Sequence, residues 1–559
     1  MPEGLGIDLD GIAEPRAREL IRRLLNLLED VMSDLRKALA ENQRLRDEVN
    51  RLKGEQGKPK IKANKPAAGS RNYSSEAERR QKREWTKSSK VDEIPIDREE
   101  VVAIDPDTLP EDAEFKGYED VVVQDVIFRS DNILFHKEKW YSPSEGKTHL
   151  AALPAGYTGQ FGPGIKALAL VLYFGAQTSE PKLVEVLRSM GVSISDGQVS
   201  NLLIKDHEPF HAEKAALYEA ALGASPWQNV DDTSTRVNGQ NGYCHIVANP
   251  LHTTYFTKPA KDRLTIIDVL RGDQPRQFVI NAEALALAEQ LGLSATRRRE
   301  MGALPQGQTV DEATFLEWLE ESMPGLGPIQ RTWVLDAAAI AAYHAQTEFP
   351  VLRLIVVDGA PQFNLVTAAL ALCWIHEGRH YKKLVAWVRM HAHHVEAFLK
   401  RFWAYYGELL AYGEQPTPEE AERLSQAFDV LFATRTGYRA LDERIAKTAT
   451  KKDLLLAVLV HPEIPLHNNA AELGARGRVR KRDVSFGPRT QDGARAWDTF
   501  MTLAATAKKL GVNFYHYILD RVSGTNAMPS LAQTIRERAS ELDLGASWQP
   551  DPQARSPDY

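Results

Sequence analysis

The chain has 559 residues, a formal net charge of −7, and 43% hydrophobic and 26% charged residues. This balance is typical of a soluble globular protein with several domains, and it excludes a uniformly basic nucleic-acid coat but not a local basic patch. The two cysteines, Cys244 and Cys373, exclude a disulfide framework and every four-cysteine zinc site, and they fit a reducing compartment. The first residues lack the pattern of a signal peptide, and the apolar runs are too short to span a bilayer.

A heptad pattern in residues 1–57 predicts a coiled-coil dimerisation helix. Apolar residues alternate at spacings of three and four over more than four heptads, at seam positions that include Leu28, Leu35, Asn42, Leu45 and Val49. Such a seam pairs with another helix, and a seam asparagine such as Asn42 favours a parallel dimer in fixed register. The alternative is an amphipathic helix that packs on the chain's own globular body.

The next segment is basic and almost free of aliphatic residues. Because such a composition cannot offset its ordering entropy by burial, we expect residues 58–100 to form a flexible linker. Its lysines and arginines favour a DNA-phosphate contact or, equally, a solvated connection.

Residues 101–222 are expected to form two small modules. The first, residues 101–159, reads as β-rich, with short strands at 121–123, 126–128, 133–135 and 139–141. The second, residues 160–222, reads as helical, and its helices at 181–190 and 195–205 resemble a helix-turn-helix with Ser195 as N-cap. Either it docks on DNA or it is an ordinary pair of packed helices.

The order of elements from residue 227 predicts an α/β fold with an RNase H-like mixed sheet. A strand at 227–232 ends in Asp231 and Asp232, a hairpin signal follows at 238–242, and further strands are expected at 243–248 and 253–258. A helix at 261–271 precedes two buried apolar runs, 351–357 and 368–374, the first of which ends at Asp358. In this layout the first and fourth strands are neighbours, so Asp231 and Asp358 lie side by side.

Paired carboxylates of this kind repel each other unless cations lie between them. Mg²⁺ prefers carboxylate oxygens, water and phosphate, and two such ions can activate a nucleophile and stabilise the leaving oxygen of a phosphodiester. Glu472 is the best candidate for a third ligand, because it follows Asn468 and Asn469, either of which can cap a helix.

A dense cationic run follows Glu472 and suits an anionic substrate such as DNA. The residues are Arg476, Arg478, Arg480, Lys481 and Arg482.

The chain resembles the IS sixty-six family of insertion-sequence transposases, which are of the DDE type. The resembling pieces are VDDTSTRVNG at 230–239, VVDGA at 356–360, CWIH at 373–376, and the block that begins with HNNAAE at 467 and ends at Ile518. The resemblance implies a catalytic triad of Asp231, Asp358 and Glu472, with Asp232 at a position that is usually Glu. It also matches Cys373 and His376 to a Cys-x-x-His pair.

The resemblance implies a transposase that binds the ends of its element as double-stranded DNA, cleaves a strand with two Mg²⁺ (or Mn²⁺) ions and transfers it to target DNA. A bacterial, cytoplasmic and nucleoid-associated location follows, without a membrane partner. The catalytic domain would span residues 223–515 with insertions at about 274–349 and 381–460, followed by a C-terminal helix and tail at 516–559. Family members usually carry a four-cysteine zinc knuckle, but residues 101–159 hold no cysteine, so no zinc is expected.

Three alternatives stay open. The chain can be a catalytically silent DNA-binding relative, or an RNase H-like nuclease without strand transfer. The third is a zinc protease, because His376-Glu377-Gly378-Arg379-His380 fits the H-E-x-x-H pattern. Gly378 weakens the helix that this motif needs, and no third ligand follows at the usual spacing.

Overall fold

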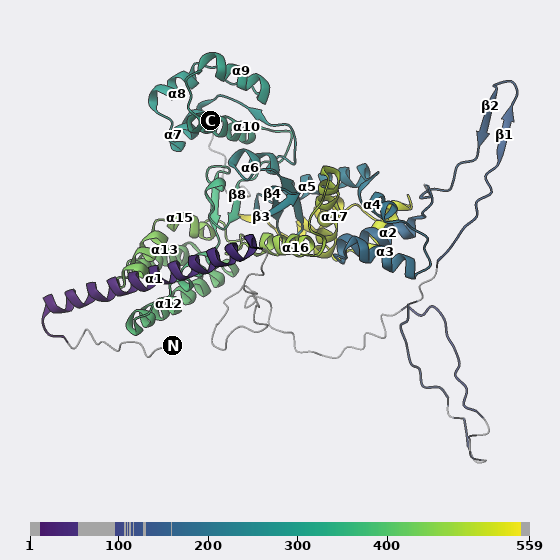
Figure 1. Cartoon of the computed structure of the whole chain (residues 1–559), viewed down its shortest axis with the longest axis horizontal. Helices are drawn as coiled ribbons and strands as arrows, with labels where there is room; N and C mark the ends of the chain where they lie inside the picture. Colours follow the sequence, from purple (N-terminus) through teal and green to yellow (C-terminus); the bar gives the residue numbers. More distant parts are fainter. Residues whose placement is uncertain are drawn as a thin grey trace.

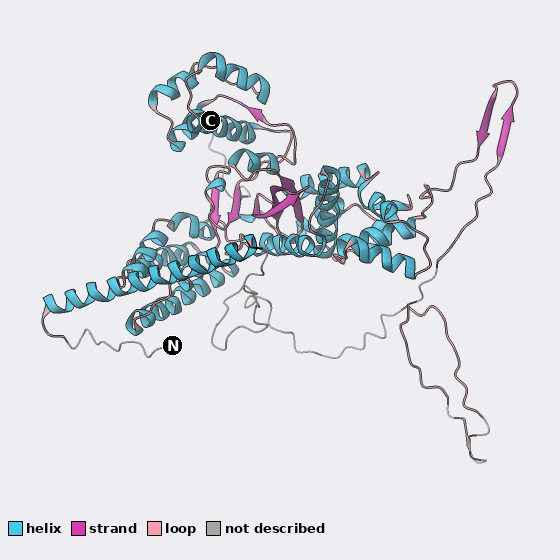
Figure 2. Cartoon of the chain, in the orientation of Figure 1, coloured by secondary structure: helices cyan, strands magenta, loops and turns pink. Residues whose placement is uncertain are grey.

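The computed structural model describes residues 12–53 and 95–548, except 106–107, 109, 111–112, 116, 127–129 and 158. Most of the linker predicted at 58–100 lies outside the described residues, which resume at residue 95. The described chain is a mixed α/β protein in which one sheet occupies the centre and helices surround it (Figures 1 and 2). None of its described helices is long and apolar enough to cross a membrane.

The central sheet has five strands in the order β5-β4-β3-β8-β9. The first three strands pair antiparallel, whereas β3 with β8 and β8 with β9 pair parallel. The bounds are β3 Trp227–Val237, β4 Gln240–Ala248, β5 Thr253–Lys258, β8 Leu354–Val357 and β9 Ala369–Leu372. All five strands therefore fall where the sequence predicts them, and β3 and β8 are neighbours as expected.

One strand end was predicted wrongly. β3 does not stop at Asp231 and Asp232 but continues to Val237, because its second half pairs with β4 in a long hairpin. Asn238 and Gly239 form the turn with φ angles of 50° and 76°, which is the left-handed pair that a two-residue hairpin requires.

Helices cover both faces of the sheet. On one face, α16 (Asn469–Ser485) approaches so closely that a Cβ at Gly474 would lie 2.8 Å from Ile246, and Tyr255 donates its hydroxyl proton to the Gly474 carbonyl. On the other face, the ring of Tyr218 in α5 (Glu208–Gly223) packs on Phe256, and its hydroxyl donates to α6 (Arg263–Leu270).

The outer edge of β5 is closed by side chains of α17 (Gln491–Lys509). The amides of Thr253, Tyr255 and Thr257 donate in turn to Thr506, Thr502 and Asp498, at distances of 3.3, 3.1 and 2.6 Å. Every second residue of the strand thus meets every fourth residue of the helix, since the two repeats are similar in length. These side chains satisfy backbone donors that an open edge would leave for another chain.

Two helical lobes follow the two predicted insertions and lie on different sides of the sheet (Figure 1). The first contains β6 Gln277–Phe278, α7 Ala282–Leu291, α8 Ala295–Gly302, β7 Val310–Asp311, α9 Glu312–Ser322 and α10 Pro328–Ala345. The second follows α11 (Trp374–Lys382) and contains α12 Arg389–Glu414, α13 Pro418–Phe432, α14 Arg439–Ala449, α15 Lys452–Leu455 and the turn Ala457–Leu459. The chain then ends with α18 Phe514–Val522, α19 Leu531–Leu542 and the turn Ala546–Trp548.

The predicted N-terminal helix is present as α1 (Pro15–Leu52), and its first half docks on the second helical lobe. Asn26 donates to the Gly437 carbonyl and accepts from the Arg439 amide, while Leu25 is buried. Glu29 accepts hydrogen bonds from two backbone amides just before α12. Packing on its own chain, the alternative interpretation, therefore holds for this half.

The second half of α1 presents its predicted seam to solvent. Leu35, Leu45 and Val49 remain 51%, 55% and 46% exposed, and Asn42 is exposed among them. No partner helix covers this half within the described chain, so the coiled coil stays a prediction.

Residues 95–150 form an arm whose described side chains are mostly exposed. Its one hairpin among the described residues, β1 Lys139–Ser142 with β2 Lys147–Leu150, lies at the tip of an extended projection, apart from the long loop formed by the earlier residues (Figure 1). The strands predicted at 121–123 and 133–135 are absent, because no neighbouring strand satisfies their backbone; residues 127–128 of the strand predicted at 126–128 lie outside the described residues.

The helical segment that follows matches its prediction more closely. α2 (Pro163–Leu170) continues into a π-helical turn, Val171–Gly175. α3 (Glu180–Ser189) and α4 (Asp196–Ile204) form the predicted helix pair, and Ser195 caps α4 in a full capping box with Gln198.

Candidate active site

The pairing of β3 with β8 brings Asp231 and Asp358 to the same end of the two strands. β3 and β8 pair parallel with Trp227 opposite Leu354 and Asn229 opposite Val356. Asp231 lies two residues beyond the last paired residue of β3, and Asp358 directly follows the last residue of β8. Gly359 follows with a φ of 97°, which turns the chain directly after this carboxylate, and Asp358 accepts the Ala360 amide at 3.2 Å.

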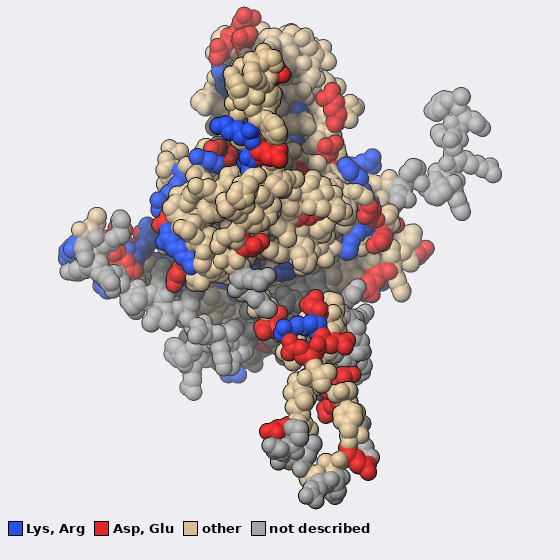
Figure 3. All heavy atoms as spheres, turned by 90° about the vertical axis from the view of Figure 1, so that its right-hand side faces the viewer, with Lys and Arg blue, Asp and Glu red and all other residues tan. Residues whose placement is uncertain are grey.

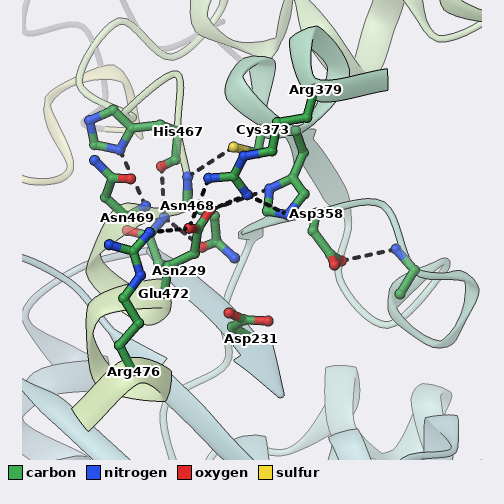
Figure 4. Close-up of polar contacts among 12 residues, drawn as sticks. Asn229, Asp231, Asp358, Cys373, Arg379, His467, Asn468, Asn469, Glu472 and Arg476 are labelled. Carbon is green, nitrogen blue, oxygen red and sulfur yellow. Dashed lines mark hydrogen bonds and ion pairs between the residues drawn. The ribbon is translucent and has the colours of Figure 1, made fainter. Parts of the chain in front are cut away.

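A third carboxylate is brought to the same place by the start of α16. Asn468, the residue before this helix, is fully buried; it accepts from Asn229 at 3.0 Å and donates to the Val230 carbonyl at 2.7 Å. The helix is thereby anchored to β3 one residue before Asp231, and Glu472 lies in its first turn. Figure 4 shows the three carboxylates around one space.

An open cavity of about 590 Å³ lies beside these residues, and Asp231, Glu472, Arg476 and Arg480 are among its lining. Burial, together with the negative charges of Asp358, Asp232 and Glu472, raises the pKa of Asp231 to about 7, against one backbone hydrogen bond that lowers it. A carboxyl group in a cleft whose pKa is raised by burial and by neighbouring acids is a candidate for a functional residue.

Cations of the chain itself surround Glu472. Arg379 of α11 donates to both of its carboxylate oxygens at 3.4 and 3.2 Å, and Arg476 contacts it at 3.4 Å. The His376 Nδ1 lies 3.4 Å from the same carboxylate. Burial lowers the pKa of His376, and the neighbouring Arg379 lowers it further.

Asp232 lies apart from the three acids. Because side chains alternate along a strand, it points to the other face, where it accepts hydrogen bonds from Lys261 at 3.4 Å and Gln362 at 3.1 Å. Cys373 lies beside Glu472 instead: its buried sulfur accepts the Asn468 amide at 3.3 Å and belongs to a cluster with His376 and Glu472.

The residues of the predicted basic run differ in their exposure to solvent. Arg476 and Arg480 are exposed at the cavity. Arg478 and Lys481 are buried, so the prediction that they contact DNA does not fit this structure. Arg478 pairs with Asp498 at 3.3 Å, and Lys481 lies 3.1 Å from the centre of the Tyr173 ring.

The remaining member of the run, Arg482, is half-buried and donates to the Ser234 carbonyl. On the face shown in Figure 3, the described Lys and Arg residues gather in separate clusters near the margins and form no continuous stripe.

The H-E-x-x-H motif serves the packing of the second helical lobe. Glu377, the base that a zinc protease would need, is 4% exposed and is bound by Arg444, Thr448 and Lys451. α11 nevertheless continues through Gly378. A Cβ at this position would lie only 2.5 Å from the Trp403 ring of α12. The glycine is therefore required by close helix packing, and Glu377 is not free to act as a base.

Sequence reasoning missed two of the groups that build this site. In the H-E-x-x-H pattern Arg379 is only one of the two unspecified positions, so the motif gave it no role. It lies one helical turn from His376, on the same face of the helix. Asn229 precedes Asp231 by two residues on β3 and is buried at 1% exposure, a position where an amide side chain needs a specific partner.

The chain is similar to one curated protein, the uncharacterized protein y4jO of Sinorhizobium fredii (strain NBRC 101917 / NGR234). The two are 31% identical over 324 residues, which is 58% of this chain and 100% of the relative. The chain belongs to the family of y4jO. No protein-family model matches the chain, and neither does any solved structure. The name of this relative states no activity.

Proposed function

We propose that the chain is a DDE-type transposase that binds the ends of its element and carries out Mg²⁺-dependent DNA strand cleavage and strand transfer. The observation that carries the proposal is the parallel pairing of β3 with β8, which brings Asp231 and Asp358 to the same end of these strands, together with the anchoring of Glu472 beside β3 through Asn468. The strand order supports it, since three antiparallel strands followed by two parallel ones, with β3 at the centre, is the layout of an RNase H-like sheet.

The chemistry of the donors suits magnesium. Asp231 of β3, Asp358 directly after β8 and Glu472 in the first turn of α16 offer the carboxylate oxygens that Mg²⁺ prefers, and Asp231 and Glu472 line the open cavity. The raised pKa of Asp231 supports the same conclusion, because a bound cation would replace the proton that burial favours. When bound, two such ions would activate water or a 3′-hydroxyl and stabilise the leaving oxygen.

The chain's own residues have two further tasks. Arg476 and Arg480 line the cavity and can hold phosphates that flank the scissile bond. Arg379, which donates hydrogen bonds to Glu472, can bind an incoming phosphate instead. The Glu472 carboxylate is then free to bind a cation. Both tasks follow from the same pairing chemistry, since guanidinium groups bind carboxylate and phosphate in the same bidentate way.

Partners follow from the proposal: double-stranded DNA of the element ends and the target, and a second copy of this chain. The exposed outer half of α1 supports self-association, because a leucine seam of this length gains stability only when another helix covers it. A cytoplasmic, nucleoid-associated location goes with this function.

The test is cleavage of labelled duplex DNA that flanks the chain's own gene by the full-length protein, with and without Mg²⁺. We expect Mg²⁺-dependent nicks and joined products, both lost in Asp358→Asn and retained in Asp483→Asn, an exposed acid on α16. Cleavage without joined products would instead favour a nuclease. Binding without cleavage, or equal cleavage by wild type and Asp358→Asn, would exclude the proposed catalytic site.

A further inference from the structure

A second set of ligand atoms overlaps the acidic site. The Cys373 sulfur, a ring nitrogen of His376 and a carboxylate oxygen of Glu472 all lie within 4.8 Å of one another. Cys373 immediately precedes α11, His376 lies in the first turn of that helix, and Glu472 lies in the first turn of α16. Two helix starts therefore direct three different donors to one point.

The donors differ in kind from those of the magnesium site. Thiolate and imidazole together select Zn²⁺ and related ions, whereas Mg²⁺ takes oxygen ligands only. In tetrahedral geometry with bonds of about 2.0–2.3 Å, ligand atoms lie roughly 3.3–3.8 Å apart. The three donor atoms, which all lie within 4.8 Å of one another, would therefore have to approach by at most about 1.5 Å to bind one ion.

Two of the donors are available for a metal. The Nδ1 of His376 is buried and has no hydrogen-bond partner among the described residues. Burial raises the pKa of the Cys373 thiol to about 11, so a metal would have to displace its proton; the hydrogen bond from the Asn468 amide to the sulfur favours the resulting thiolate.

The third donor is shared with arginines. Arg379 and Arg476 form ion pairs with the Glu472 carboxylate. Their side chains are 38% and 62% exposed, so they can move into solvent when a cation binds to Glu472. The cost of breaking such partly exposed pairs is small compared with the free energy of zinc binding.

We propose that Cys373, His376 and Glu472 form a site for Zn²⁺, and that zinc bound there inhibits DNA cleavage by withdrawing Glu472 from Asp231 and Asp358. Binding releases the thiol proton of Cys373 to solvent, and no redox step is involved. This differs from the expectation that the chain holds no zinc. The inhibitory half rests on the proposed function, but the binding half does not.

Cobalt(II) is the probe for the binding half, because a cobalt–thiolate bond gives an absorption band that oxygen and nitrogen ligands do not give. We expect full-length protein to bind one cobalt ion with this band and zinc to displace it. The band should vanish in Cys373→Ser, in which a hydroxyl can still accept the Asn468 amide. It should persist in Cys244→Ser, the matched control, whose cysteine is equally buried in β4. A wild type without the band, or a Cys373→Ser variant with it, overturns the proposal.

The inhibitory half is tested by titrating zinc into the Mg²⁺-dependent cleavage reaction. Loss of a direct ligand should raise the zinc concentration for half-inhibition at least about tenfold in Cys373→Ser, with Cys244→Ser unchanged. Equal inhibition of both variants overturns this half. Cobalt binding through Cys373 without DNA cleavage would support the metal site and exclude the proposed transposase activity. DNA cleavage without a cobalt–thiolate band would support the transposase activity and exclude the metal site.

Discussion

Asn229 of β3 donates its side-chain amide to the side-chain oxygen of Asn468 at 3.0 Å, across 239 residues of sequence. Asn468 in turn donates to the Val230 carbonyl, so the pair fixes where α16 begins relative to the strand that carries Asp231. The distance between Asp231 and Glu472 is thus set by an amide pair and not by the acids themselves.

We expect Asn468→Ala to lower the free energy of unfolding by about 2–3 kcal/mol, because it leaves buried polar partners unsatisfied. DNA cleavage should fall as well, since Glu472 loses its anchor. Urea unfolding followed by circular dichroism measures the first effect. Asn469→Ala, at the half-buried first position of α16, is the control and should change stability little. Equal effects of the two variants would contradict the anchoring role.

Lys509 predicts a pH-dependent stability. Burial lowers its pKa from 10.5 to about 7, while its ammonium donates to the Asn249 and His252 carbonyls. Between these two pH values the unfolded chain binds the extra proton, so the Lys509 contribution to the free energy of unfolding rises with pH. Relative to Lys509→Met, wild type should therefore gain up to about 4 kcal/mol from pH 7 to pH 10. Urea unfolding over this range measures the change, and Lys508→Met, at the exposed neighbour, should show no such trend.

Two helical glycines should respond in opposite directions to alanine. Gly378→Ala places a methyl group 2.5 Å from the Trp403 ring and should destabilise the protein by about 1–3 kcal/mol. Gly407, in α12, has no atom within 4 Å of the added Cβ, so Gly407→Ala should stabilise by about 1 kcal/mol. Thermal unfolding separates the two, and a stabilising Gly378→Ala would refute the close packing of α11 on α12.

The Glu377 network gives a test against the protease alternative. Glu377→Gln should cost about 3 kcal/mol of stability, because Arg444 and Lys451 lose a buried counter-charge. His380→Ala, on the exposed side of α11, should change stability by less than about 0.5 kcal/mol and leave DNA cleavage intact. Peptide hydrolysis that depends on His380 and Glu377 would contradict this reading.

The outer half of α1 predicts self-association. Leu45→Lys places a charge on the exposed seam and should shift the full-length protein from dimer toward monomer in sedimentation experiments. Gln43→Lys adds the same charge on a position outside the seam and should leave the dimer intact. A wild type that is monomeric at micromolar concentration would exclude pairing through this helix.

Local signals predicted much of the fold because they act over a few residues. The Asn238-Gly239 turn fixes the β3–β4 hairpin, and Ser195 with Gln198 fixes the start of α4. The extent of β3 could not be read in the same way, because its second half is held by pairing with β4 and not by burial. The strands expected at 121–123 and 133–135 have strand-like residues but no neighbouring strand to pair with.

The candidate site was predictable as far as topology determines it. Once β3 and β8 are parallel neighbours, Asp231 and Asp358 lie toward the same end of the pair. The outcome for the basic run depends on tertiary packing: Arg478 and Lys481 face inward because Asp498 and Tyr173, distant in sequence, supply their partners. Arg379 acquires its role only because α11 and α16 start side by side.

The docking of α1 has a mechanical consequence. Glu29 accepts hydrogen bonds from the amides of Trp387 and Val388 and contacts His391. The buried carboxyl group of Glu29 therefore attaches α1 to the start of α12. A force applied to the free end near Leu52 is therefore transmitted along one rigid rod of 38 residues to the lobe that follows α11. If two copies pair through the outer halves of α1, the length of this helix sets the separation between their two acidic clefts.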